Sequence, residues 1–321
     1  MNSKEEKEPS CELPNWLNDF QLIFPKATDK DVTLRIIEIT KNVPRPHPIL
    51  KSLTREISSE QLYELLIADA EIAAKILQAV NSAAFCLEQE VISLNFAIIY
   101  MGMNLVRDIA LKIALSNMDS YTPKQNKAFK NIWASGFLGS CISTLLARSI
   151  GLRNTTEIAT QTLLSLIGDI AIVSYQPHFA ELYTDNIPFL ERIIIEQQEL
   201  GTNAALIGER LAIEWDLPNT LAERIRYSLT PLSVPAAESP LTGENLQSVV
   251  LSYVASRISE LIILKNDGMK FDNKNFLTLD CPEFFYLQDY LKLAEMTKIE
   301  TFINSSHFTR ELNQFINRII I

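Results

Sequence analysis

The stretch that decides the fold covers residues 68–85 and reads ADAEIAAKILQAVNSAAF. Asp69 can cap a helix, and Glu71 stands in the first turn, where a carboxylate interacts favourably with the helix dipole. Apolar side chains then recur at helical spacing from Ile72 to Val80, so they share one face. We therefore predict an amphipathic helix that packs this face against a core.

Helical signals continue on both sides of this stretch. Ser58 and Gln61 have the spacing of a capping box. The uncharged run over residues 131–147 is too polar for a membrane span, and we expect it to lie inside one long core helix over residues 124–150. A stripe of small side chains along that helix predicts the close approach of another helix: Gly136, Gly139, Ser140, Ser143 and Ala147. Further helices are expected over residues 155–173, 188–200, 203–215 and 221–228.

Composition favours the same fold class. The chain has 321 residues, of which 47% are hydrophobic, and only nine glycines. No segment of useful length has the two-residue period of a strand. We predict an all-α fold with a single multi-helix domain flanked by helices at both ends. The expected divisions are a flexible tail over residues 1–13, N-terminal helices over 14–42, the central domain over 43–235, and C-terminal helices over 236–321 that pack on the core.

Charge and cysteine usage narrow the function classes. The formal net charge of −10 disfavours binding to nucleic acid or to anionic membranes, because phosphates require an excess of Lys and Arg. The four cysteines form no CxxC pair, and the first residues do not resemble a signal peptide. We therefore expect a reduced, cytoplasmic location without membrane insertion, and we interpret Cys86 and Cys141 as structural.

The order of the motifs resembles the HDOD family, the HD-related output domains of bacterial signalling proteins. That family has an aspartate-capped helix ending in Asn-Ser-Ala and an aromatic residue, to which residues 69–85 correspond. A Ser-Leu-x-x-Ala-Ile helix follows at residues 93–98, and a glycine-led turn at residues 102–107. The sequence from Leu163 to Gly168 is similar to the Leu-Leu-His-Asp-Ile-Gly signature of HD-type hydrolases. The resemblance covers roughly residues 43–235.

The resemblance implies a metal site that has lost its ligands. HD phosphohydrolases hold divalent metal with imidazoles and a carboxylate, and the metal activates water and neutralises phosphate charge. By motif position, Ser165 and Leu166 replace the His-Asp pair in this chain. The other ligand positions fall on Ser135, Asn203, Ser228 and Ser256. Hydroxyls and a leucine are poor substitutes for imidazole and carboxylate, so we expect no catalytic residue, no metal and no cofactor.

Five further residues are candidates for a role in a site or in a partner contact. His47, His178 and His307 share no helical spacing with one another, and we interpret them as surface or loop residues. Asp169 follows Leu166 on the same expected helix; it could reach the pocket, but a solvated or paired role is the preferred interpretation. Arg107 is expected on an exposed turn, as either an ordinary surface charge or a partner contact, and the sequence does not decide between these.

Three functional hypotheses follow. The leading one is a non-enzymatic signalling module that binds protein partners of a bacterial pathway on a degenerate HD-hydrolase scaffold. The first alternative is a cryptic metal-dependent phosphohydrolase with an unforeseen site. The second is a small-ligand sensor, in which the former metal cavity holds a nucleotide against its serine and asparagine side chains.

Overall fold

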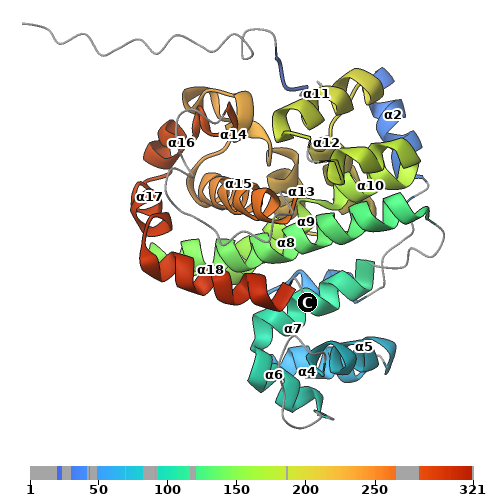
Figure 1. The fold of residues 1–321 in the computed structure, drawn as a ribbon, viewed down its shortest axis with the longest axis vertical. Coiled ribbons are helices and arrows are strands. Elements are labelled where there is room, and N and C mark those ends of the chain that lie inside the picture. Colours follow the sequence, from blue (N-terminus) through green and yellow to red (C-terminus); the bar gives the residue numbers. More distant parts are fainter. Residues whose placement is uncertain are drawn as a thin grey trace, which may run out of the picture.

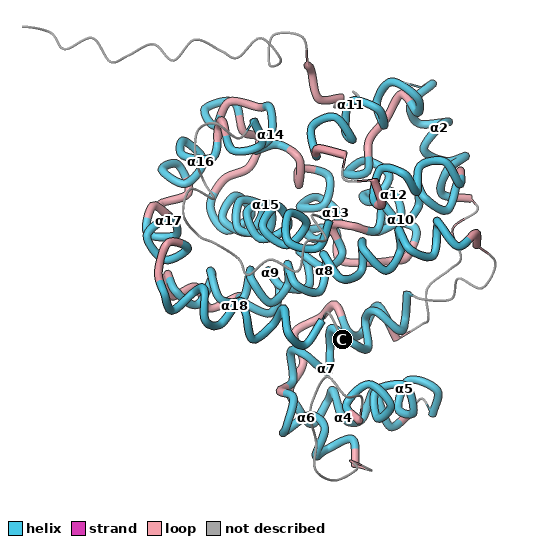
Figure 2. The backbone as a smooth tube through the Cα atoms, viewed as in Figure 1, coloured by secondary structure: helices cyan, strands magenta, loops and turns pink. Residues whose placement is uncertain are grey.

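The computed structural model describes residues 20–23, 30–41, 43, 49–68, 70–81, 91, 93–115, 121–185, 187–264 and 282–319. Within these ranges all regular secondary structure is helical, as Figure 2 shows, which confirms the predicted all-α class. The expected tail at residues 1–13, the proline-rich segment 44–48, and Cys86 lie outside the described residues.

The helices between Ser59 and Leu115 form a lobe below the rest of the molecule, whereas the helix Lys30–Thr40 packs on the body (Figure 1). The capping box at Ser58 is confirmed, with Gln61 N–H bonded to the Ser58 hydroxyl and Ser58 N–H bonded to the Gln61 side chain. Gly102 separates two helices with a φ of +84°, a conformation that favours glycine. The helices up to this lobe's end are α2 (Lys30–Thr40), α3 (Leu50–Leu53), α4 (Ser59–Ile67), α5 (Ala70–Val80), α6 (Leu94–Met101) and α7 (Met103–Leu115).

The long helix α8 (Pro123–Ser149) runs through the middle of the molecule (Figure 1). The small-residue stripe allows the predicted close approach of other helices, because α9 (Thr155–Leu164) and α15 (Gly243–Leu264) both pack against α8. A Cβ atom on Gly139 would lie 3.2 Å from both the Ser259 hydroxyl and a Thr162 methyl group. Gly136 is similarly close to Leu163 and Leu166. The stripe thus brings the motif region and the C-terminal part of the chain onto one helix.

The single helix expected over residues 155–173 is wrong, because it breaks at Ser165 and Leu166. The break lets α9 pack on α8 while α10 turns to pack on α12. A Cβ atom on Gly168 would lie only 1.8 Å from the Ala204 carbonyl oxygen, so α10 and the start of α12 touch backbone to backbone. The elements here are α9 (Thr155–Leu164), α10 (Ile167–Tyr175), η2 (Pro177–Tyr183), α11 (Phe189–Leu200), α12 (Ala204–Glu214), α13 (Asn219–Arg226) and α14 (Thr230–Ser233).

The C-terminal part wraps back onto the core. Helix α15 packs on α8 and α9, and α18 lies along α8. Thr297 and Glu300 have the spacing of a capping box, which predicts one at this position, but the Thr297 side chain makes no capping hydrogen bond. Two stretches, Thr155–Tyr175 and Gly243–Leu264, are long and apolar enough to span a membrane, but 83% and 78% of them lie buried inside the protein. The elements are η3 (Ala236–Glu238), α15 (Gly243–Leu264), η4 (Pro282–Phe284), α16 (Leu287–Leu293), α17 (Lys298–Ile303) and α18 (Ser306–Ile319).

Candidate functional site

The break between α9 and α10 forms one wall of a small cavity. Ser165 and Leu166 line it together with Ser228, which follows α13, and Ser256 of α15. Ser135 of α8 lines an adjoining cavity that shares Leu166 with the first. The tertiary structure therefore brings together five of the six residues that the resemblance singled out, although they are spread between residues 135 and 256 of the sequence.

Asn203 departs from the expectation, because it lines neither cavity. Its side-chain oxygen accepts the N–H of Leu206 at 3.2 Å and caps α12. Its amide nitrogen donates to the carbonyl oxygen of Ile23 at 3.2 Å. An asparagine at a helix N-terminus satisfies free backbone groups there, and this role turns Asn203 away from the cavity.

The cavity is small, and the wall formed by the residues that the resemblance singled out carries no charged side chain. The larger cavity measures about 30 Å³ and the adjoining one about 10 Å³, counted as space open to the centre of a water molecule. Since roughly 10–15 Å³ of such space holds one water, the larger one has room for about two. The Ser165 hydroxyl is already used, because it donates to the Thr162 carbonyl at 2.8 Å.

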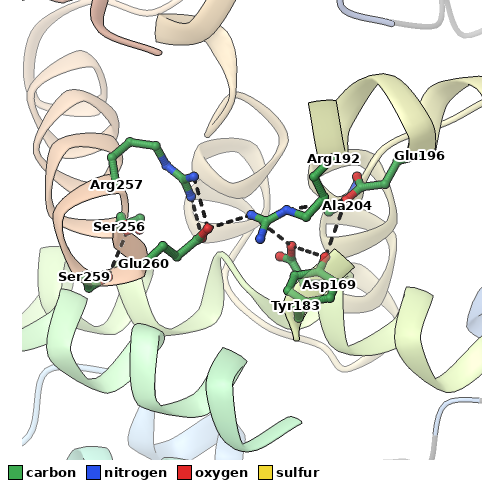
Figure 3. A network of polar contacts seen from close by, with 9 residues as sticks. All are labelled: Asp169, Tyr183, Arg192, Glu196, Ala204, Ser256, Arg257, Ser259 and Glu260. Atoms are coloured by element: carbon green, nitrogen blue, oxygen red, sulfur yellow. Dashed lines mark hydrogen bonds and ion pairs between the residues drawn. The ribbon is translucent and has the colours of Figure 1, made fainter. Parts of the chain in front are cut away.

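The opposite wall carries buried charge, which the sequence analysis missed. Arg192 of α11 is 1% exposed, and its Nη2 lies 2.7 Å from Oε2 of Glu260 on α15. Arg257 approaches the same carboxylate from the other side, with Nη2 at 2.5 Å from Oε1. Figure 3 shows Glu260 between the two guanidinium groups. A buried carboxylate held by two arginines is fully paired inside the protein.

Aromatic rings support the two cations. The Arg192 guanidinium lies 4.5 Å from the ring centre of Tyr183 and 5.0 Å from that of Phe189. The Arg257 guanidinium lies 3.2 Å from the ring centre of Phe189. Such contacts stabilise a desolvated cation. Arginine therefore occupies a site that is prepared for a fixed positive charge.

Two more carboxyl groups complete the network (Figure 3). The Tyr183 hydroxyl donates to Oδ1 of Asp169 at 2.6 Å and lies 3.4 Å from Oε1 of Glu196. The Ala204 N–H donates to Oε2 of Glu196 at 3.1 Å. Nη2 of Arg192 is 3.9 Å from Oδ1 of Asp169. Asp169 is thus paired and buried rather than solvated, and it lines the larger cavity.

The pKa shifts reflect this division of charge. Burial opposes ionisation of Glu260, but Arg192 and Arg257 outweigh it and lower the pKa of Glu260. Burial raises the pKa of Asp169, and Arg192 only partly opposes the shift. Burial and the neighbouring Asp169 raise the pKa of Glu196 to about 8. The negative charge of Glu260 is therefore held between two positive ones, whereas the pKa values of Asp169 and Glu196 are raised.

These residues do not fit a divalent metal. The positions implied as ligands carry hydroxyls and the methyl groups of Leu166, and the Arg192 guanidinium lines both cavities with its charge. A metal ion there would face the Arg192 cation, and the Glu260 carboxylate beside it is already paired with two arginines. Within the part of the chain that the structure describes, no group of three or more His, Cys, Asp or Glu side chains could hold a metal ion.

The remaining candidates are now placed. His178 pairs with Glu199 on the surface at 2.9 Å, and His307 lies 3.0 Å from Arg310 at an exposed position. His47 lies outside the described residues. The expectation of an exposed Arg107 is wrong: it is buried, and its Nε and Nη2 each donate at 2.5 Å to the carbonyl oxygens of Leu53 and Arg55.

One sequence signal could have revealed the network. Helix α15 contains Arg257 and Glu260 within an otherwise mostly uncharged, apolar stretch. Asp169 similarly stands alone among apolar residues in α10. Since charged residues are seldom buried without partners, isolated charges in core helices predict that they pair with one another. The partners themselves could not be assigned without the tertiary structure.

The helical fold and the cavity at the α9–α10 break are those of an all-helical domain of the HDOD type. The family model for the HDOD domain matches residues 48–231, and the chain belongs to this family. No curated protein matches the chain.

Solved structures share the fold at low sequence identity. An HDOD domain protein of unknown function from Geobacter sulfurreducens has a TM-score of 0.58 and 17% identity over 89% of this chain and 99% of its own. A Shewanella amazonensis SB2B protein provisionally named a phosphohydrolase has a TM-score of 0.55 and 19% identity over 88% and 97%. A Marinobacter aquaeolei VT8 protein provisionally named for signal transduction has a TM-score of 0.56 and 16% identity over 94% and 62%.

Proposed function

We propose that this chain is a non-enzymatic signal-transduction module of the bacterial cytoplasm, which acts by binding protein partners on its HDOD scaffold. One observation carries the proposal: the Arg192 guanidinium, paired with Glu260, lines the cavity where the resemblance implies a metal. A fixed protein cation removes the need for a metal ion but supplies no activated water. The scaffold then remains as a surface for contacts.

The two alternatives have less support. A metal-dependent phosphohydrolase would need several ligands at once, and Ser165, Leu166 and Ser256 provide none that suits a transition metal. A nucleotide sensor would need more space than the cavity of about 30 Å³ gives. The serine side chains that line the cavity are therefore better explained as small residues that fill the core around the ion network.

Metal content distinguishes the proposal from the enzyme. Full-length protein, purified without chelators and without an affinity tag, is expected to contain no stoichiometric transition metal by elemental analysis. The double variant Ser165→His with Leu166→Asp restores the motif pair, and it is also expected to stay metal-free, because Arg192 and the other neutral positions are unchanged. A stoichiometric metal in the wild-type protein, with hydrolysis of a phosphate ester, would overturn the proposal.

Two further measurements address partners and ligands. Pull-down from the native cell at physiological salt is expected to recover a specific regulatory protein. A thermal-shift screen of nucleotides is expected to show no stabilisation, whereas a ligand present at 100 times its dissociation constant would add about 2.7 kcal/mol. A clear shift with one nucleotide would favour the sensor.

A further inference from the structure

Residues 20–23 lie in an extended segment at the junction of α11 and α12. Leu22 is 6% exposed and belongs to a hydrophobic cluster of the body, whereas Gln21 is exposed. Phe20 and Ile23 are half-buried. Leu22 thus faces the protein while the neighbouring Gln21 faces solvent, as successive side chains of an extended peptide do.

Three hydrogen bonds hold the backbone of this segment, and all of its bonded groups belong to Gln21 and Ile23. The Ile23 N–H donates to Oε1 of Gln197 at 2.8 Å. Nε2 of Gln197 donates to the Gln21 carbonyl at 3.1 Å, and Nδ2 of Asn203 donates to the Ile23 carbonyl at 3.2 Å. Residues two apart expose their N–H and C=O groups on the same edge of an extended chain. The side-chain amides of Gln197 and Asn203 therefore form hydrogen bonds along one edge of the peptide, as a neighbouring strand would.

The two amide side chains are fixed before any peptide is considered. Oδ1 of Asn203 accepts the Leu206 N–H at the start of α12, so its Nδ2 can only point outward. That nitrogen also donates to Oε1 of Gln197 at 3.3 Å. Preorganised groups lose less freedom when a ligand binds. The two side chains are thus preorganised to bind a peptide backbone, and their hydrogen bonds to the segment involve its backbone and not its side chains.

The apolar side of the contact reaches the wall of the degenerate site. Leu22 shares its hydrophobic cluster with Phe189, Ile193, Ala205 and Leu229. The same four residues line the larger cavity. A side chain seated at the position of Leu22 therefore packs into the cluster that forms this wall.

We propose that the α11–α12 junction, with Gln197 and Asn203, is a binding site for an extended peptide of a protein partner, and that residues 20–23 occupy it as a tethered stand-in. This deepens the proposed function and rests on it in one respect, that the module acts through protein partners. The partner segment needs a large aliphatic side chain at the position of Leu22 and a free N–H at the position of Ile23. It is unrestricted at the position of Gln21.

The chemistry of the contact favours this partner. Backbone hydrogen bonds give affinity to any extended segment, and a pocket for alternate side chains gives selectivity. The chain's own residues 20–23 are joined to α2, which begins at Lys30, so they compete at a high effective concentration. A partner must therefore bind more strongly than this short internal segment, and its arrival would free the N-terminal part of the chain.

The test measures binding of a labelled peptide with the sequence of residues 18–26 to the full-length protein by fluorescence anisotropy. In the Leu22→Asp protein the internal segment loses its anchor, and we expect the peptide to bind at least tenfold more tightly than to wild type. Adding Gln197→Ala removes two of the three backbone bonds and is expected to reverse that gain. Gln21→Ala is the matched control, because only the backbone of Gln21 takes part, and it should behave as wild type.

Several results would overturn the proposal. Equal peptide binding by wild type and Leu22→Asp would show that the segment is ordinary packing, as would binding that ignores Gln197→Ala. If Leu22→Asp does not fold, Ile23→Pro replaces it, since proline removes the N–H that Gln197 accepts. A wild-type dimer that Leu22→Asp dissolves would reassign the site to a second copy of this chain. Peptide binding can fail while the pull-down still yields a partner, so the two proposals are separable.

Discussion

Glu260 and Asp108 are both buried carboxyl groups, yet their pKa values shift in opposite directions. At Glu260, two arginines outweigh burial and lower the pKa. At Asp108, on α7, burial raises the pKa to about 7, and the Ser140 hydroxyl and Arg107 oppose it only in part. Arg107 is next in sequence, but its guanidinium donates to the carbonyls of Leu53 and Arg55 instead. A neighbouring guanidinium outweighs the effect of burial on the pKa of a carboxyl only when it contacts the carboxylate directly.

The two carboxyl groups differ in the positive charge that the protein places around them. Around Glu260 the protein supplies its own positive charge, on side chains that aromatic rings support. At the contact between α7 and α8, Asp108 accepts a hydrogen bond from the Ser140 hydroxyl at 2.5 Å. Glu260 is therefore expected to stay charged near neutral pH, whereas Asp108 is expected to titrate there.

The largest expected effect comes from removing the cation. Arg192→Met leaves Glu260, Asp169 and Glu196 buried with less positive charge, so Glu260 should come to resemble Asp108. Breaking a buried ion pair from one side costs about 3–5 kcal/mol, and we expect that loss in the free energy of unfolding measured with urea.

The control for this change is Arg210→Met. Arg210 pairs with Glu214 at 2.6 Å on the surface of α12, and an exposed pair contributes about 0–1 kcal/mol. If Arg192→Met is no more destabilising than Arg210→Met, the network does not hold the helices together and the comparison fails.

The second effect is pH dependence at Asp108. The folded carboxyl keeps its proton up to about pH 7, whereas an unfolded aspartate loses it near ~3.9. The folded state thus binds more protons between these values, and stability falls as pH rises through this window. The expected loss from this group is about 2 kcal/mol between pH 5.5 and 8.

Asp108→Asn should remove this loss, so the variant gains stability relative to wild type as pH rises. Urea unfolding at several pH values measures the difference between the two proteins. Glu196, with its pKa raised to about 8, contributes a slope of the same sign to both proteins and cancels in that difference. A difference that stays constant from pH 5.5 to 8 would show that Asp108 does not titrate there.

A smaller effect is expected from Ser140→Ala, which removes the hydroxyl that donates to Asp108. The loss should be about 1 kcal/mol, and it should be greater at pH 8, where the carboxylate is charged, than at pH 5.5. Ser143→Ala is the control, because the Ser143 hydroxyl bonds only to the Ser140 carbonyl of its own helix. Equal pH dependence in the two variants would contradict this account of Asp108.

The smallest effect is expected from Ser165→Ala in the neutral wall of the cavity. The Ser165 hydroxyl bonds to the Thr162 carbonyl within the same turn, so its loss should change the unfolding free energy by no more than about 0.5 kcal/mol. The metal content should also be unchanged. A loss comparable to that of Arg192→Met would place the important chemistry at Ser165 after all.

Much of the local structure could be predicted, because it depends on neighbouring residues. The capping box of Ser58, the turn at Gly102, and the limits of α8 follow from side chains within a few positions. The break at Ser165 and Leu166 was missed, because it depends on how closely Gly168 approaches Ala204 from another helix. Five of the six candidate residues line two adjoining cavities, whereas Asn203 caps α12, and its hydrogen bond to Ile23 joins residues 180 apart in the sequence.

The sequence by itself determined that the chain is helical and that Ser165, Leu166 and Ser256 cannot act as imidazole and carboxylate ligands, since both follow from the side chains present. Only the tertiary structure decided what stands there instead. Arg192 and Glu260 lie 68 residues apart in the sequence, and their 2.7 Å contact joins α11 to α15, which packs on α8 and α9. Helix periodicity acts over a few residues, whereas buried charges are matched across the whole core.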